Sequence, residues 1–408
     1  MLHVLQSLRT GVTELADVPV PRASATSIVV ETRASVISPG TERMLVEFGR
    51  AGWIEKARSQ PEKVQQVLSK IRTDGIVPTI DAVRAKLDDP VALGYCHAGI
   101  VREVGREVTA FKPGDRVVTN GPHAEYVRVA QTLAAKIPSG VSYEAAAFAP
   151  LAAIALEGLR LANPTLGETV VVYGLGPIGL LAVQLARAAG CNVIGIDRSA
   201  ERCVLAEKFG ATALHADEDT DVASAVTERT GGIGADFVLL TLATDSDDPV
   251  KHAANMSRKR GRIVLVGVTG LTLRRDDFYK KELSFQVSCS YGPGRYDPSH
   301  EESGIDYPLP YVRWTEGRNF SAVLNLMADG RLDPQPLITH RFPIHSAPSA
   351  YALITNGTPS LGIVLSYEEK KDEVDQSSRT LVLRKPSPAG KARVGFIGAG
   401  NFAARVLI

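Results

Sequence analysis

A glycine-rich turn at residues 174–179 constrains the fold of this chain more than any other feature. An apolar run at 169–173 precedes the turn, and the residues after it predict an apolar helix over 178–189. In this context glycines permit a tight turn and let backbone amides approach a pyrophosphate at the helix N-terminus. We therefore expect a dinucleotide to bind here. The predicted site comprises Gly174, Leu175, Gly176, Pro177, Ile178 and Gly179.

A carboxylate follows the next predicted strand. Asp197 ends the apolar run 192–196 and lies 18 residues after Gly179 (197 minus 179). At that place a carboxylate hydrogen-bonds the hydroxyls of an adenosine ribose and repels a 2′-phosphate, which favours NAD over NADP. The neighbouring Arg198 can pair with such a phosphate, so NADP remains the alternative cofactor. Gly267 and Ser290 complete the predicted cofactor-binding set.

Strand-like and helix-like segments alternate after residue 164, which predicts a parallel, doubly wound sheet. The first 130 residues instead carry short β runs punctuated by proline and glycine, among them 27–32, 33–37, 99–104, 115–119 and 124–129. Two helices are expected between residues 55 and 87, where apolar residues recur at helical spacing. The chain is thus expected to combine a β-rich unit with an α/β unit.

Composition excludes several classes of function. With 46 basic and 45 acidic residues, the chain lacks the charge imbalance that nucleic-acid binding requires. Its four cysteines form no CxxC pair, so neither a disulfide framework nor a four-cysteine zinc site is expected. The apolar stretches at 145–156 and 170–186 are interrupted by proline, glycine or glutamine, and residues 1–11 do not resemble a signal peptide. We expect no membrane association and a cytoplasmic location.

Several segments resemble the medium-chain dehydrogenase/reductase superfamily. They are residues 94–104, Lys-Pro-Gly-Asp-Arg-Val at 112–117, Ala-Glu-Tyr-Val at 124–127, and the glycine turn. The resemblance covers about residues 1–367. It implies a GroES-like catalytic domain, formed by 1–160 and 296–367 with a helical insertion at 44–90, and a Rossmann domain at 161–295 inserted between its parts.

The alcohol-dehydrogenase branch of that superfamily holds a catalytic zinc, and the resemblance implies which residues stand at the zinc-ligand positions. In this chain they are Ser38, Tyr95, Cys96, and Leu151 or Ala152. A catalytic zinc requires a set of thiolate and imidazole ligands at tetrahedral spacing, and only the adjacent Cys96 and His97 offer such ligands here. Neighbours on a strand point to opposite faces, so we expect no metal site.

Without zinc, another group must stabilise or protonate the alkoxide that forms during hydride transfer. The candidates lie in the segments that line the family's active cleft. A structural role is equally open for each of them, because residues at such positions also act in turns and helix caps. The predicted catalytic residues are Thr41, Glu42, Tyr95 and His97.

Residues 38–42, the helical insertion and residues 290–297 resemble the zinc-independent members of bacterial bi-domain oxidoreductases. In those proteins a second unit of the glucose-fructose oxidoreductase/inositol dehydrogenase type follows. Residues 368–392 are charged and contain prolines, which indicates a linker. Residues 393–408 resemble the first strand and glycine turn of that second unit, which is cut off there.

Aromatic residues and arginines gather between residues 291 and 319. Aromatic rings stack on sugars and guanidinium groups bind carboxylates or phosphates, so this loop is a candidate contact for a carbohydrate-like substrate. A loop fastened to its own domain by tyrosine and arginine packing is the alternative. The predicted substrate residues are Tyr291, Arg295, Tyr296, Arg313 and Trp314.

These features predict a zinc-independent, NAD(P)-dependent oxidoreductase that moves hydride between nicotinamide and a carbonyl or alcohol carbon of a sugar or sugar derivative. A reductase of activated double bonds is a second possibility, and a non-catalytic unit that binds dinucleotide or docks a partner is a third. The apolar run 283–289 is expected to form the last strand of the Rossmann sheet. An exposed edge there predicts a homo-oligomer.

Overall fold

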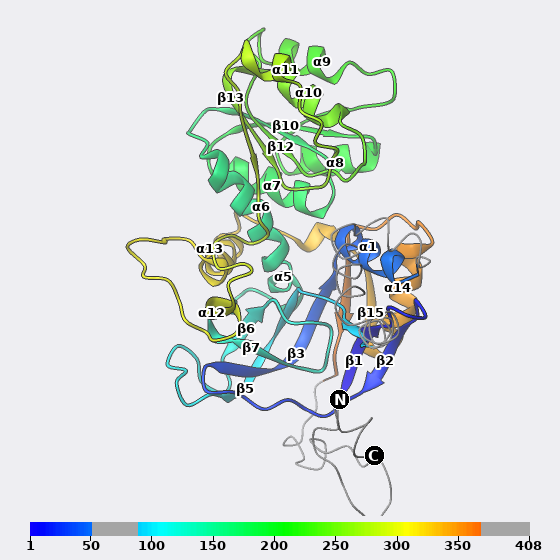
Figure 1. The fold of residues 1–408 in the computed structure, drawn as a ribbon, viewed down its shortest axis with the longest axis vertical. Helices are drawn as coiled ribbons and strands as arrows, with labels where there is room; N and C mark the ends of the chain where they lie inside the picture. Colours follow the sequence, from blue (N-terminus) through cyan, green and yellow to red (C-terminus); the bar gives the residue numbers. More distant parts are fainter. Residues whose placement is uncertain (51–88, 369–408) are drawn as a thin grey trace, which may run out of the picture.

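The computed structural model describes residues 1–50 and 89–368, and the strands of this part of the chain form three sheets. Figure 1 shows a six-stranded sheet with its helices, in green, above a seven-stranded sheet that is largely blue and cyan. Helices α5 (Tyr143–Ala146) and α6 (Ala149–Ala162) lie between the two sheets. The sheets are therefore joined through helices and not edge to edge.

The six-stranded sheet is parallel and has the strand order β11-β10-β9-β12-β13-β14. This order changes direction at β9 and β12, where the carboxyl ends of the strands leave a crevice. The strands are β9 (Thr169–Tyr173), β10 (Asn192–Asp197), β11 (Thr212–His215), β12 (Ala235–Leu240), β13 (Ser257–Leu265) and β14 (Ser284–Val287). Their helices are α7 (Pro177–Ala188), α8 (Ala200–Lys208), α9 (Val222–Arg229), α10 (Asp248–Met256) and α11 (Arg275–Tyr279).

Strand β3 (Ser27–Ile37) is central to the seven-stranded sheet, where it pairs with β5, β7 and β16. Ile37 of β3 lies opposite Ile363 of β16, so segments from both ends of the described chain build one sheet. The other strands are β5 (His97–Val104), β6 (Arg116–Thr119), β7 (Tyr126–Ala130), β8 (Ala134–Lys136), β15 (Ile338–Pro343) and β16 (Gly362–Ser366). A smaller sheet joins β1 (Leu2–Gln6), β2 (Thr13–Asp17) and β4 (Val91–Ala92).

Further helices surround the seven-stranded sheet. They are α1 (Pro39–Arg50), α12 (Pro298–Glu301), α13 (Glu316–Ala328) and α14 (Ala347–Thr355), with 3-10 turns at Gln131–Leu133, Gln335–Leu337 and Ile344–Ser346. In Figure 1, α1 lies on the side of this sheet that faces the six-stranded unit, and α12 and α13 lie beside α5.

One apolar core extends from the lower sheet into the upper one. It includes Val36 of β3, Leu151 of α6 and Val172 of β9. Val171 of β9 is buried in a separate core on the other face of the six-stranded sheet. Strand β9 is thus covered on both faces, as a central parallel strand requires.

The predicted alternation of strands and helices is confirmed. The strand expected at 169–173 is β9, and the helix expected at 178–189 is α7 with a shift of one residue. The two short strands expected at 27–32 and 33–37 are wrong, because β3 continues through both and bends at a bulge between Thr32 and Ala34. Helix α6 is not predicted, because most of its residues are buried and show no amphipathic period.

Several predictions lie outside the described residues. They are the helices between 55 and 87, most of the insertion at 44–90, the linker at 368–392 except Glu368, and the fragment at 393–408. The domain boundaries at 160 and 295 stay predictions. In the described ranges no helix is both long enough and apolar enough to cross a membrane.

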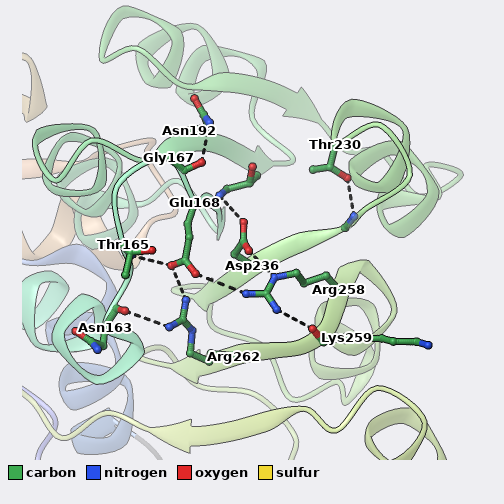
Figure 2. Close-up of polar contacts among 12 residues, drawn as sticks. Asn163, Thr165, Gly167, Glu168, Asn192, Thr230, Asp236, Arg258, Lys259 and Arg262 are labelled. Atoms are coloured by element: carbon green, nitrogen blue, oxygen red, sulfur yellow. Dashed lines mark hydrogen bonds and ion pairs between the residues drawn. The ribbon is translucent and has the colours of Figure 1, made fainter.

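A network of ion pairs fastens the amino-terminal edge of the six-stranded sheet (Figure 2). Glu168 accepts a hydrogen bond from the Thr165 backbone amide at 2.8 Å and pairs with Arg262 at 2.5 Å. Asp236 pairs with Arg258 at 2.5 Å, and Arg258 also reaches Glu168 at 3.6 Å. These side chains are only partly exposed to water. Their ion pairs are therefore less screened by solvent than pairs on the open surface.

We predict that Glu168→Gln lowers the free energy of unfolding by about 1–3 kcal/mol, because two arginines lose the carboxylate that they share. Urea denaturation of both proteins measures the difference. Glu144→Gln is the matched control, since Glu144 pairs with Arg341 where both side chains are more exposed. Its cost should be about 0–1 kcal/mol. Equal losses for the two variants would contradict the role given to this network.

Candidate functional site

Three glycines shape the turn after β9, each for a different reason. Gly174 has a φ of +104°, and a Cβ on it would lie 2.6 Å from the Leu242 backbone nitrogen. A Cβ on Gly179 would lie 1.9 Å from the Gly174 carbonyl oxygen. A Cβ on Gly176 would meet nothing within 4 Å. The first two glycines are required by the packing of the protein, whereas Gly176 borders open space.

Helix α7 begins at this open space without a side-chain cap. Its N-cap is Gly176 and its first residue is Pro177. Free amides in the first turn of a helix, together with the helix dipole, attract an anionic group. Ile178 packs against the apolar core that contains α6, which holds this turn in place. The residues present therefore fit the pyrophosphate of a dinucleotide.

Asp197 lies at the end of β10, beside the turn. One carboxylate oxygen accepts the Leu175 amide at 2.6 Å, and the other accepts the Ser199 amide at 2.9 Å. These bonds fix the carboxylate next to the site for the pyrophosphate, and each oxygen retains a lone pair for a ribose hydroxyl. Arg198 is exposed next to it. In the first turn of α8, the Arg202 guanidinium lies 3.7 Å from the Asp197 carboxylate, a contact that the sequence analysis did not predict.

Gly267 and Ser290 occupy different surroundings. A Cβ on Gly267 would lie 2.0 Å from the Leu242 carbonyl oxygen, so this glycine lets the loops after β12 and β13 approach each other. Ser290 has a φ of +50°, in the left-handed region, and directly precedes the buried Tyr291. Their contact with a cofactor stays a prediction.

Tyr95 contributes a buried hydroxyl that has no hydrogen-bond partner of good geometry. Ser38 and Thr41 lie beside this hydroxyl, and its ring centroid is 6.4 Å from that of Tyr291. Burial, reinforced by the nearby Cys96, raises the pKa of Tyr95 well above its usual value. The phenol is therefore protonated at neutral pH.

Glu42 is fully buried, and its carboxylate is engaged by several donors. It accepts the Ser38 amide at 2.9 Å, the Tyr351 hydroxyl, and His123 Nε2 at 3.2 Å. His123 is hydrogen-bonded on its other nitrogen to the Ser35 hydroxyl at 2.7 Å. Glu42 thus fastens α1 to α14 and to the loop before β7. No sequence motif predicts this arrangement, and the sequence analysis did not identify His123 as a partner of Glu42.

His97 lies inside the sheet with both ring nitrogens occupied. Nε2 is 2.9 Å from the Thr32 hydroxyl and Nδ1 is 2.9 Å from the Thr119 hydroxyl. Burial lowers its pKa to about 3, so the ring is neutral. The structure therefore brings Thr41, Glu42 and Tyr95 together around the start of α1 and places His97 among strands.

The residues predicted to contact substrate lie on the loop between β14 and α13. Arg295 stacks on Tyr296, with 4.2 Å from its guanidinium carbon to the ring centroid, and pairs with Glu301. The Trp314 ring lies near two guanidinium groups, at 3.6 Å from that of Arg160 and 3.9 Å from that of Arg313.

Much of this loop is held by contacts within the protein. Arg160, which was missed in the sequence, also donates to Asn319 at 2.9 Å and connects the loop to α6. Tyr296 is 72% exposed and Arg313 is exposed, so both remain accessible to a ligand. Substrate contact for the five predicted residues stays a prediction.

The residues at the implied zinc-ligand positions do lie together. Tyr95 is beside Ser38, and Cys96 lies against the backbone of Leu151. Burial raises the pKa of the Cys96 thiol well above its usual value, which opposes the thiolate that zinc binds. A hydroxyl, a phenol and an aliphatic side chain complete the set. Among the described residues no three His, Cys, Asp or Glu side chains are arranged for a metal. This donor set does not fit zinc.

Comparison with known proteins identifies the family. Residues 63–139 match the alcohol dehydrogenase GroES-like domain, and residues 177–303 match the zinc-binding dehydrogenase family. D-guloside 3-dehydrogenase of Escherichia coli is 31% identical over 281 residues, which cover 66% of this chain and 75% of that protein. (R,R)-butanediol dehydrogenase of Bacillus subtilis is 28% identical, with 62% and 73% covered.

Solved structures share the fold. The alcohol dehydrogenase TADH from Thermus sp. ATN1 superposes with a TM-score of 0.68 at 22% identity, covering 90% of this chain and all of that one. The expected fold class, a GroES-like β-rich domain with a doubly wound Rossmann domain, is confirmed. The chain belongs to the medium-chain dehydrogenase/reductase superfamily, among the zinc-binding dehydrogenases, and is an NAD(P)-dependent dehydrogenase or reductase of that type.

Proposed function

We propose that this chain is a zinc-independent, NAD-preferring oxidoreductase that acts on a carbonyl or alcohol carbon of a sugar or sugar derivative. The observation that carries the proposal is the uncapped start of α7, which faces open space at Gly176 beside Asp197. The first turn of α7 would hold the pyrophosphate, and Asp197 would hold the adenosine ribose. When bound, the nicotinamide supplies or accepts the hydride.

The substrate class is supported by the relatives and by the loop after β14. D-guloside 3-dehydrogenase and sorbitol dehydrogenase 1 of Saccharomyces cerevisiae, the latter 28% identical, are both named for sugars or polyols. Tyr296 presents an exposed ring supported by Arg295, and such rings stack on the apolar faces of sugars. We place the substrate between this loop and Tyr95.

Zinc independence is supported by the chemistry of Ser38, Tyr95, Cys96 and Leu151, which offers no set of tetrahedral ligands. Among the predicted catalytic residues, Thr41 and Tyr95 have hydroxyl groups that lie beside each other and are available for the reaction. The atoms of Glu42 and His97 are engaged in holding the protein together, so neither is assigned to the reaction.

We also propose a homo-oligomer formed through β14. This strand is the edge of the six-stranded sheet, and Val287 on it is 55% exposed. Leu271, Leu273 and Tyr279 are exposed nearby in sequence, and exposed apolar side chains next to a free strand edge favour pairing with a second copy. The second oxidoreductase unit and the cytoplasmic location stay predictions.

We predict that NAD binds more tightly than NADP and that Asp197→Ala weakens NAD binding about 10-fold to 100-fold, through loss of charge-assisted hydrogen bonds. NADP binding should change much less, because the variant also loses a repulsive charge. Isothermal titration calorimetry measures both affinities. Asp197→Asn serves as the control because it keeps an acceptor for a backbone amide. An unaltered protein that prefers NADP would overturn the assignment and favour Arg198 and Arg202.

We predict that NAD is reduced in the presence of at least one member of a panel of glycosides and polyols, followed by NADH absorbance at 340 nm. Because the donor set does not fit zinc, dialysis against a chelator should leave the rate unchanged. One equivalent of zinc, lost together with activity, would contradict zinc independence. Turnover of enones alone would identify a double-bond reductase, and no turnover at all would leave a binding role.

We predict a particle of at least twice the 43.6 kDa chain mass by light scattering at micromolar concentration. Val287→Lys should shift it towards the monomer, because a charge on the edge strand opposes pairing. Val12→Lys is the control, since Val12 is 52% exposed far from this edge. A monomeric unaltered protein would exclude the proposed assembly.

A further inference from the structure

The Tyr95 hydroxyl is shielded from water and lacks a hydrogen-bond partner of good geometry, although its ring is only half-buried. A buried hydroxyl in this condition destabilises the folded protein, because it has lost its hydrogen bonds to water. Phenylalanine would fill nearly the same volume without that cost. Buried polar groups in folded proteins are nearly always hydrogen-bonded. A ligand that supplies the missing hydrogen-bond partner would explain this unpaired hydroxyl.

A path to solvent leads from this hydroxyl. Ser38, which directly follows β3, is buried, and Thr41, in the first turn of α1, is exposed. Both side chains lie beside the Tyr95 hydroxyl. Hydroxyl groups both donate and accept hydrogen bonds, so Thr41 and Ser38 can pass a proton from water to Tyr95.

Tyr95 also lies on the same apolar core as the cofactor turn. Its ring packs against the core that contains Leu151 and Tyr291, and Ile178 of the glycine turn packs against that core as well. Tyr95 and the cofactor turn therefore both pack against the core that the two sheets share.

We propose that the Tyr95 hydroxyl binds the substrate oxygen and donates its proton to it, and that Thr41 and Ser38 return a proton from solvent. In the reducing direction the carbonyl carbon gains a hydride from the reduced nicotinamide, and the carbonyl oxygen gains the phenolic proton. The Tyr95 oxygen, left with a negative charge, then recovers a proton from water. This inference rests on the proposed function and names its proton donor.

Two features favour Tyr95 over its neighbours. Burial raises its pKa, so the phenol keeps its proton at neutral pH and can donate it to the more basic alkoxide. His97 is neutral with both nitrogens bonded to threonines, and the Glu42 carboxylate already accepts from Ser38, His123 and Tyr351.

Tyr95→Phe tests the proposal by two readouts. We expect kcat for carbonyl reduction to fall at least about 100-fold, with KM and the Kd of NADH nearly unchanged. We also expect the melting temperature to stay the same or rise, because a buried hydroxyl without a partner has been removed. Tyr351→Phe is the matched stability control, since it removes a hydroxyl bonded to Glu42, and it should lower the melting temperature.

Tyr143→Phe is the activity control, because the Tyr143 ring also packs against the shared core, under Arg116, and its hydroxyl is given no role. Full activity in Tyr95→Phe, with an active unaltered protein, would overturn this inference and leave the proposed function intact. A melting temperature that falls as far as that of Tyr351→Phe would show a structural hydroxyl and would also overturn it. An unaltered protein that turns over no carbonyl or alcohol would refute the proposed function, and this inference with it.

Discussion

The antiparallel pairing of β3 with β16 determines where everything else in this protein lies. It brings residues near the start of the chain against residues that follow the six-stranded sheet, so that sheet must be inserted into the β-rich unit. Strand β3 also pairs with β5 and β7, and its carboxyl end leads directly into Ser38 and α1. The position of Ser38 and of the residues at the start of α1 therefore depends on a contact between segments that are far apart in the chain.

The strand, turn and helix around the predicted cofactor site could be predicted from local information. The glycine turn and Asp197 belong to one β-α-β stretch, in which hydrogen bonds from Leu175 and Ser199 act over short distances. The packing roles of Gly174 and Gly179 follow from the same turn chemistry. Arg202 was missed because nothing in a sequence tells whether an arginine in a first helical turn points towards a carboxylate or into solvent.

The second half of the site could not be predicted in this way. Glu42 obtains its partners from the loop before β7 and from α14, and the His123 and Tyr351 that bind it occur in no recognisable motif. From the sequence, His97 is as good a candidate for the proton donor as Tyr95. Only the structure shows that both of its ring nitrogens are hydrogen-bonded to threonine hydroxyls. In the loop between β14 and α13, Arg295 pairs with Glu301 of the same loop. Arg160, which contacts Trp314 of this loop, comes from α6, a helix far away in sequence. Whether a polar side chain is free or engaged depends on contacts between distant segments.

The apolar core that includes Val36, Leu151 and Val172 belongs to both sheets at once. Each sheet also has a core of its own on another face, but on the side where the two sheets meet they share one interior, and α6 lies within it. A wide rotation of one sheet against the other would expose that shared core to water, so only small sliding motions of the packed surfaces keep it buried. A large-to-small substitution in this shared core therefore weakens the support of both sheets, whichever sheet the substituted residue belongs to.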